Sequence, residues 1–280
     1  MTGYAHPELL VETDWLAAHL NDPNLRVVDC RYYFDGRDGH AIYLDGHIAG
    51  AVHAAYPVEL SDPTATPSNL IPRPDQLAAT MERLGISDDT LVVGYDDEGG
   101  HFASRLWWVL TYYGHDRVAI LNGGIVKWQA EGRPLVPGPV APPIGRFTPG
   151  SPRTEMRIRA DELRATLANP NLRLLDVRRL SEYTGEEVRA ARGGRIPGAT
   201  PLFWQDNLNP DWTFRGADEI RARHAAVDAT PDKSLVTYCQ GGVRAAHAAF
   251  CLRLIGYDDV RMYDGSWAEW GNRQDLPIEK

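Results

Sequence analysis

Short apolar runs alternate with longer segments of helical character along the whole chain. LRVVD (25–29) and LRLLD (172–176) are rich in aliphatic and β-branched residues, as buried strands are. Helices are predicted over 13–20, with Thr13 as its N-cap, and over 73–85, which ends on a glycine stop. Strands that alternate with helices of this size predict crossover units and a mainly parallel sheet flanked by helices.

This pattern occurs twice. The segments 25–29, 46–51, 90–96 and 118–128 recur, in the same order, as 172–176, 194–199, 234–239 and 260–270. A repeat of this length indicates two copies of one domain, because the repeats of a solenoid are much shorter. The expected fold class is therefore α/β, with two tandem three-layer domains.

A proline-rich passage separates the two copies. Residues 133–153 contain seven prolines, which excludes a helix interior or a central strand and predicts an extended, semi-stiff connector. We predict a first domain over 1–136, a linker over 137–153 and a second domain over 154–280.

Composition and charge narrow the function classes. The 280 residues are 43% hydrophobic and carry a net charge of −9, which argues against a nucleic-acid surface. No run is apolar enough for a membrane span, and the N-terminus lacks the pattern of a secretory signal. Three scattered cysteines suit a reducing compartment, so we expect a cytoplasmic protein. The histidines and cysteines show no metal-ligand spacing, and we predict neither a metal nor a cofactor.

The stretch CQGGVR (239–244) is the strongest candidate for chemistry. Cys239 follows the predicted strand 234–238 and precedes a helix that starts near Val243, so it lies at the sheet edge where α/β proteins bind ligands. Amides of a glycine-containing loop and a helix N-terminus favour anions there, and Arg244 adds a planar cation. Together they favour the thiolate, which is the nucleophilic form.

The repeat provides an internal control for this interpretation. Where the second copy has Tyr238-Cys239, the first has Tyr95-Asp96, followed by an acidic loop that is one residue longer. The scaffold is the same but the thiol is absent. If one copy is catalytic, it is the second.

Three motifs resemble those of the tandem-domain rhodaneses, the thiosulfate and 3-mercaptopyruvate sulfurtransferases. VRMYDGSWAEW (260–270) is similar to the family's C-terminal signature, and YLDGHIAGA (43–51) to its N-terminal signature, except that Ala49 replaces the usual proline. Residues 105–128 look like the non-catalytic first domain, and Asp96 at the cysteine position fits that domain. The similarity extends over nearly the whole chain.

The resemblance implies a persulfide enzyme. Cys239 would take the outer sulfur from a donor and pass it to a thiophilic acceptor by covalent, ping-pong catalysis. Arg244 would hold the sulfonate of thiosulfate. The anionic sulfur would be stabilised by the loop amides of Gln240, Gly241, Gly242, Val243 and Arg244.

The donor is predicted to be thiosulfate, with 3-mercaptopyruvate as the alternative. Mercaptopyruvate enzymes of this family typically carry a CGSGVT-like loop, and this chain has CQGGVR. Glu182 also stands where such an enzyme would have a carboxylate-binding arginine. Arg195, at a usual histidine position, is a candidate replacement for that charge or else a surface residue.

Other residues carry weaker hypotheses. Asp176 and Arg178 end the strand 172–176 and either border the substrate crevice or form a structural ion pair. Trp204 either walls the pocket or serves ordinary packing, and His247 is interpreted as mainly structural.

The two remaining cysteines, Cys30 and Cys251, are expected in the core.

Two further functions remain open from the residues alone. A cysteine phosphatase or arsenate reductase also places a thiolate beside an arginine, but generally with one more residue between them. A non-catalytic persulfide-binding module would keep the fold without turnover. The expected partners are small-molecule sulfur donors and acceptors, with cyanide, thioredoxin or another thiol as acceptor and no nucleic acid or membrane.

Overall fold

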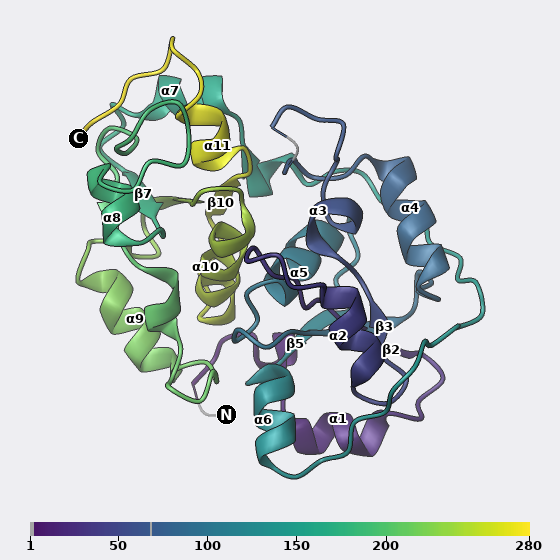
Figure 1. Ribbon diagram of the computed structural model, residues 1–280. Coiled ribbons are helices and arrows are strands. Elements are labelled where there is room, and N and C mark those ends of the chain that lie inside the picture. Colours follow the sequence, from purple (N-terminus) through teal and green to yellow (C-terminus); the bar gives the residue numbers. More distant parts are fainter. Residues whose placement is uncertain (1–2, 68) are drawn as a thin grey trace.

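A computed structural model describes residues 3–67 and 69–280 of the chain. Figure 1 shows two lobes, one for each half of the sequence, each with helices packed around a central sheet. Every strand pair in both sheets is parallel. The predicted pair of α/β domains is confirmed.

The first half contains a five-stranded sheet in the order β1-β5-β4-β2-β3. Its strands are β1 (Leu10–Val11), β2 (Leu25–Asp29), β3 (Val52–His53), β4 (Leu91–Tyr95) and β5 (Val118–Leu121). Its helices are η1 (Pro7–Leu9), α1 (Thr13–His19), α2 (Gly39–Asp45), α3 (Tyr56–Glu59), α4 (Pro74–Arg83), α5 (Ala103–Tyr112) and α6 (Gly124–Ala130).

The second half repeats this topology in the order β6-β10-β9-β7-β8. Its strands are β6 (Arg157–Ile158), β7 (Leu172–Asp176), β8 (Thr200–Pro201), β9 (Ser234–Tyr238) and β10 (Val260–Tyr263). Its helices are η2 (Thr154–Met156), α7 (Ala160–Thr166), α8 (Leu180–Thr184), η3 (Trp204–Asn207), α9 (Ala217–Ala225), α10 (Val243–Leu254) and α11 (Ser266–Trp270).

The element boundaries follow local sequence rules with one exception. The helix-ending glycines Gly85, Gly114 and Gly256 all have positive φ, the conformation that glycine adopts most easily after a helix. Thr13 is the first residue of α1 and not its N-cap, which is Glu12. The prediction for Thr13 was wrong by one position because Glu12 already has the extended backbone of a cap.

The proline-rich passage has the extended form that its composition predicts. Residues 137–153 contain neither helix nor strand. The passage runs along the first half, where its amides at Gly138, Gly145 and Arg153 donate hydrogen bonds to that half's carbonyl groups. The exact domain boundaries remain a prediction.

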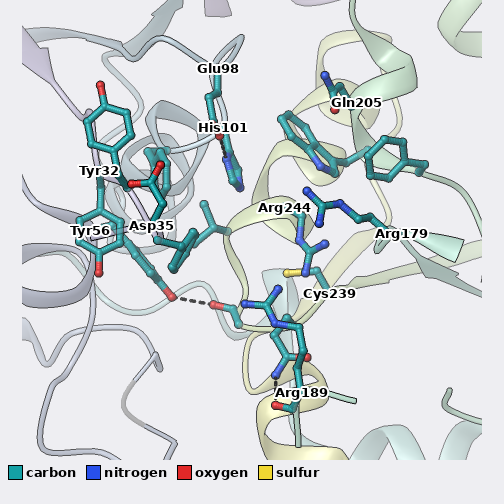
Figure 2. A pocket seen from close by; sticks show the side chains of 18 of the residues that line it. Tyr32, Asp35, Tyr56, Glu98, His101, Arg179, Arg189, Gln205, Cys239 and Arg244 are labelled. Atoms are coloured by element: carbon teal, nitrogen blue, oxygen red, sulfur yellow. Dashed lines mark hydrogen bonds and ion pairs between the residues drawn. The ribbon is translucent and has the colours of Figure 1, made fainter. Parts of the chain in front are cut away.

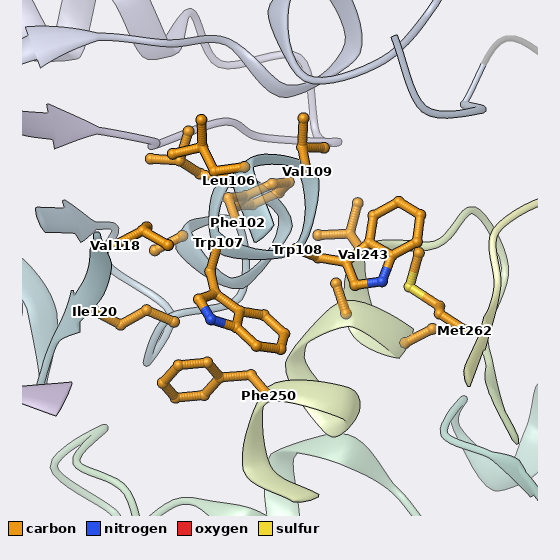
Figure 3. Close-up of a cluster of buried hydrophobic side chains, with 14 of the residues drawn as sticks. Phe102, Leu106, Trp107, Trp108, Val109, Val118, Ile120, Val243, Phe250 and Met262 are labelled. Carbon is orange, nitrogen blue, oxygen red and sulfur yellow. The ribbon is translucent and has the colours of Figure 1, made fainter. Parts of the chain in front are cut away.

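The two halves meet across α5 and α10, which pack side by side at the centre of the molecule (Figure 1). Figure 3 shows the apolar part of this contact, where Trp107 of α5 meets Phe250 of α10 edge to face at 5.1 Å between ring centroids. Aromatic pairs in this geometry stabilise a contact beyond the area they bury. One of the three hydrophobic clusters therefore spans both halves, and each half has a further cluster of its own.

A buried ion pair also joins the halves. Arg105 of α5 donates to Asp264, which follows β10, at 2.7 Å, and both side chains are almost fully buried. The second carboxylate oxygen of Asp264 accepts the amide of Ile71 at 2.7 Å. Removing one member of such a pair would leave an uncompensated buried charge, so these contacts strongly constrain the relative position of the halves.

Candidate functional site

Cys239 lies directly after β9 and one turn before α10, as the sequence predicts. Its side chain is almost fully buried, but it forms part of the wall of a cavity between the two halves. The Gly242 amide donates to the cysteine Sγ at 3.1 Å. Gly242 has φ 87°, which a residue with a Cβ rarely adopts, and it is the N-cap of α10. The sulfur thus faces a loop amide and the start of a helix.

Ser266 holds the backbone of the nucleophile from the other side. Its Oγ accepts the Cys239 amide at 3.1 Å and donates to the Tyr263 carbonyl at 2.9 Å. Ser266 has φ 51°, an unfavourable conformation for a residue other than glycine. Sequence reasoning missed this residue, because the positive φ is visible only in the folded chain.

The cavity has a volume of about 590 Å³ and draws its walls from both halves. Figure 2 shows Cys239, Arg244, Arg179 and Arg189 on the side of the second half, with aromatic side chains opposite. Of the predicted loop residues, Gln240, Gly241, Val243 and Arg244 line the cavity. Gly242 contributes its amide to the sulfur instead.

Arg244 does not face the cavity as a free cation. Its two terminal nitrogens donate to the Glu182 carboxylate at 2.6 and 2.9 Å, in a bidentate pair. Burial alone would raise the pKa of Glu182, but the hydrogen bonds and the charge of Arg244 outweigh it and lower that pKa. The pair fixes the guanidinium beside the thiol and offsets part of its charge.

Two further arginines complete the cationic wall. Arg179, the N-cap of α8, is exposed and lines the cavity, and Arg189 lies 3.7 Å from Glu182. Gln240 reaches toward the same segment and donates from its side chain to the Arg189 carbonyl. Neither arginine was expected in the site from the sequence, since both lie far from the thiol along the chain.

The first half contributes a cluster of aromatic side chains to the cavity wall. Tyr32, Phe34, Tyr56 and Phe102 form a cluster with ring centroids 5.3 to 6.2 Å apart. Phe34 remains 64% exposed, although it is a large apolar side chain. The Tyr56 hydroxyl donates to the Gly241 carbonyl at 2.8 Å, so the cluster also supports the thiol loop.

Asp176 and Arg178, predicted to border the substrate crevice, lie outside the cavity lining. They form a buried ion pair at 2.6 Å, and Arg178 also donates to the Gly194 carbonyl. The Tyr238 hydroxyl donates to Asp176. Because every partner is internal, this pair has the structural arrangement that was the alternative interpretation.

Arg195 is also outside the lining. It lies 3.3 Å from Glu279 and over the Tyr183 ring, and its backbone pairs with residue 279. This packing against the C-terminal segment leaves Arg195 outside the cavity lining, so the structure gives no support to a substrate-binding role for it.

Trp204 and His247 take different places. Trp204 lines the cavity, which is the first of its two interpretations. His247 is buried outside the lining and donates to the Gly99 carbonyl at 3.2 Å, and burial lowers its pKa to about 3.

Cys30 and Cys251 are fully buried, and burial raises the pKa of both thiols. Cys239 is the one cysteine that meets the cavity.

Within the described residues, no group of three or more histidine, cysteine, aspartate or glutamate side chains could hold a metal ion. Over the same residues, no helix has the length and apolar character needed to cross a bilayer.

The structure thus consists of two tandem copies of one α/β domain, and the second copy has a thiol at the carboxyl end of a parallel strand. The sequence model of the rhodanese-like domain matches residues 12–131 and 159–273. The chain belongs to the rhodanese family, and it is a sulfurtransferase of that family.

Individual relatives cover almost the whole chain. It is 39% identical over 290 residues to a sulfur carrier protein of Thermus thermophilus, covering 99% of both chains. It is 36% identical to a thiosulfate sulfurtransferase of Corynebacterium glutamicum, covering 99% of this chain and 92% of the relative. The crystal structure of the 3-mercaptopyruvate sulfurtransferase of Escherichia coli superposes with a TM-score of 0.82 at 31% identity, covering 93% and 99% of the two chains.

Proposed function

We propose that this protein transfers sulfane sulfur from thiosulfate to a thiophilic acceptor through a persulfide on Cys239. The observation that carries the proposal is the placement of the Cys239 sulfur. It receives a loop amide at 3.1 Å, lies at the start of α10 and borders a cavity lined by four arginines, three of them (Arg179, Arg189 and Arg244) from the second half. This is the environment that a thiolate and an anionic sulfur donor both require.

In the donor step, the Cys239 thiolate attacks the outer sulfur of thiosulfate. A bond forms between the cysteine Sγ and that sulfur, and the sulfur–sulfur bond of thiosulfate breaks. Its electron pair leaves with sulfite, so that the enzyme holds Cys–S–S⁻ and no external oxidant is needed. Loop amides stabilise the negative charge on the transferred sulfur, as donors do in an oxyanion hole.

The arginines have distinct roles in this proposal. Arg179 and Arg189 are the cations best placed to meet the sulfonate oxygens, because Arg244 already donates to Glu182. Arg244 supplies a fixed charge beside the sulfur. A compact dianion such as thiosulfate gains most from three guanidinium groups gathered in one wall.

A 3-mercaptopyruvate donor is the second candidate. The relatives include enzymes of both kinds, and the cavity of about 590 Å³ has room for the larger donor. The loop sequence CQGGVR and the buried carboxylate of Glu182 favour thiosulfate. The acceptor in either case is a small thiophile, with cyanide, a low-molecular-weight thiol or a protein thiol as candidates.

A side-by-side comparison of the two donors tests the proposal. The purified protein is assayed with one acceptor and each donor in turn, and kcat/KM is compared. A higher value for thiosulfate supports the proposal, while a higher value for 3-mercaptopyruvate favours the second candidate. Hydrolysis of aryl phosphates without any sulfur transfer would refute both.

A further inference from the structure

His101 occupies the loop of the first half that corresponds to the thiol loop of the second. It lines the cavity that contains Cys239, although it belongs to the copy without a thiol. Its Nδ1 lies 2.7 Å from the Glu98 carboxylate. Figure 2 shows the ring projecting from beside Glu98 into the space between the halves.

The His101 ring is held by packing, but its Nε2 has no hydrogen-bond partner. His101 stacks on Trp204 with ring centroids 4.6 Å apart and an interplanar angle of 25°. The whole residue is 6% exposed, and its Nε2 is buried without a hydrogen-bond partner. Buried polar atoms normally have a partner, so an unpaired one beside a ligand cavity calls for an explanation.

Comparison with other histidines shows what is particular about this one. His47, His115 and His224 also have a buried, unpartnered Nε2. None of these three lines the cavity. In His47 and His224 the Nδ1 pairs with a backbone carbonyl of the preceding helical turn, an ordinary structural bond. Of the four, His101 alone combines a carboxylate on one nitrogen with a place in the cavity wall.

The carboxylate determines which nitrogen carries the proton. Glu98, when ionised, can only accept hydrogen bonds, and the hydrogen bond from His101 lowers its pKa. In the neutral ring the Nδ1 therefore carries the hydrogen, and Nε2 keeps a free lone pair. A carboxylate that orients a histidine in this way is the usual arrangement around a general base.

We propose that His101 accepts the proton of the acceptor thiol in the second half-reaction, which rests on the persulfide function proposed above. The acceptor R–SH gives its proton to Nε2, and the resulting thiolate attacks the outer sulfur of Cys239–S–S⁻. An RS–S bond forms, the bond to the cysteine Sγ breaks, and its electron pair remains on Sγ as thiolate. The proton passes from Nε2 to the departing sulfur, so that R–S–SH leaves.

Such a base is useful for thiols and not for every acceptor. A thiol with the ordinary pKa of about 8.5 is mostly protonated at neutral pH, and only the thiolate attacks efficiently. The sulfite dianion attacks through a lone pair and has no proton to lose. The proposal therefore predicts a different dependence on His101 for these two acceptors.

The test is single-turnover discharge of enzyme that has first been loaded with sulfur. Thiosulfate-treated protein is freed of donor and mixed with either dithiothreitol or sulfite, and loss of the persulfide is followed by mass spectrometry. His101→Phe keeps a flat ring for the Trp204 stack but removes the base. We expect this variant to load normally, to discharge to dithiothreitol about tenfold more slowly or worse, and to react with sulfite at nearly the wild-type rate.

Two further variants keep the test decisive. His115→Phe is the matched control, because His115 also has an unpartnered Nε2 and lies outside the cavity, and it should discharge normally to both acceptors. Glu98→Gln retains the imidazole ring and removes the carboxylate that orients it. It should slow the thiol step selectively, and it serves in place of His101→Phe if that variant fails to fold.

The outcomes separate this inference from the function on which it rests. Wild-type protein that takes up no sulfur refutes the persulfide function and this inference with it. Wild-type protein that loads, together with a His101→Phe variant that discharges to the thiol at an unchanged rate, refutes the inference alone. Equal slowing with dithiothreitol and sulfite also refutes it, because that result indicates a structural role.

Discussion

The loop that follows the central strand begins with a carboxylate in the first half and with a thiol in the second half. In the first half, the Asp96 carboxylate accepts four backbone amides of its own loop, from Glu98, Gly100, Phe102 and Ala103, at 2.7 to 2.9 Å. In the second half, the Cys239 sulfur occupies the equivalent position. One scaffold therefore makes an anion-binding nest twice, and the first copy fills its nest with its own carboxylate. A nest filled in this way has no room for an external sulfur.

The two halves share a buried aspartate–arginine pair with a tyrosine hydroxyl bound to it. Asp29 and Arg31 form a buried pair at 2.6 Å that accepts the Tyr95 hydroxyl, and Asp176 and Arg178 do the same with Tyr238. Because this trio is present in the thiol-free copy as well, its side chains serve the fold.

A thiol alone should not activate the first half. We expect an Asp96→Cys, Cys239→Ser double variant to show no sulfur transfer. Asp97 and Glu98 follow the new thiol directly and would repel both a thiolate and an anionic donor. A thiosulfate assay checks this, with Cys239→Ser as the background. Transfer above that background would show that the acidic loop does not prevent catalysis.

The next largest loss of activity is expected when the charge of Arg244 is removed. Arg244→Ala alone would leave the Glu182 carboxylate buried without its partner, which is strongly destabilising, so the informative variant is Arg244→Ala with Glu182→Gln. We expect thiosulfate turnover to fall by about 10², as when a positioned charge donor is lost.

Arg195→Ala is the control for that variant, because Arg195 lies outside the cavity lining, and it should retain turnover. A charge-free double variant with wild-type kcat/KM would contradict a role for Arg244 beside the sulfur.

The two halves also differ in the backbone at one pair of equivalent positions. Gly124 and Ser266 are equivalent positions with φ of 54° and 51°, but a Cβ on Gly124 would lie 2.1 Å from the Asp96 carbonyl oxygen. Gly124→Ser should therefore lower the free energy of unfolding by about 2 kcal/mol or more. Ser266→Gly relieves strain but loses a hydrogen bond, so its net change should stay within about 1 kcal/mol.

Urea denaturation of both variants tests this expectation. Equal destabilisation would mean that the second half has not adjusted its backbone to hold the serine side chain.

Acid should lower the stability of the second half, because two of its histidines are buried in the neutral form. Burial lowers the pKa of His247 to about 3 and of His224 to about 4, from 6.5. Below pH 6.5 the unfolded chain therefore binds protons that the folded chain does not, and stability falls with pH. Each histidine should remove about 2 kcal/mol from the free energy of unfolding between pH 7 and pH 5.

Denaturation of His247→Phe at both pH values tests the assignment. The loss on acidification should be smaller than in the wild type by that single contribution, and an unchanged loss would contradict it.

The sequence predicted the fold and the position of the nucleophile, because both depend on local patterns. The tandem copies follow from repeated strands and signatures, and Cys239 from its place between a strand and a helix. The sequence could not show that Glu182 binds Arg244, or that Arg179 and His101 reach the same cavity. Those contacts depend on how two loops and two domains approach each other, and no spacing along the chain encodes that distance.

The assignment of Asp176 and Arg178 to the substrate crevice had a signal against it. Both residues recur in the first copy as Asp29 and Arg31, where no thiol is present. The repeat therefore already indicated a structural pair.

The central claim is that Cys239 accepts and holds a sulfur atom. Intact-mass spectrometry of the protein after thiosulfate treatment tests it most directly, with Cys239→Ser as the control. We expect the wild type to gain the mass of one sulfur atom, a reducing thiol to remove it, and the variant to gain nothing. A wild type that gains no sulfur, or a Cys239→Ser variant that gains as much, would contradict it.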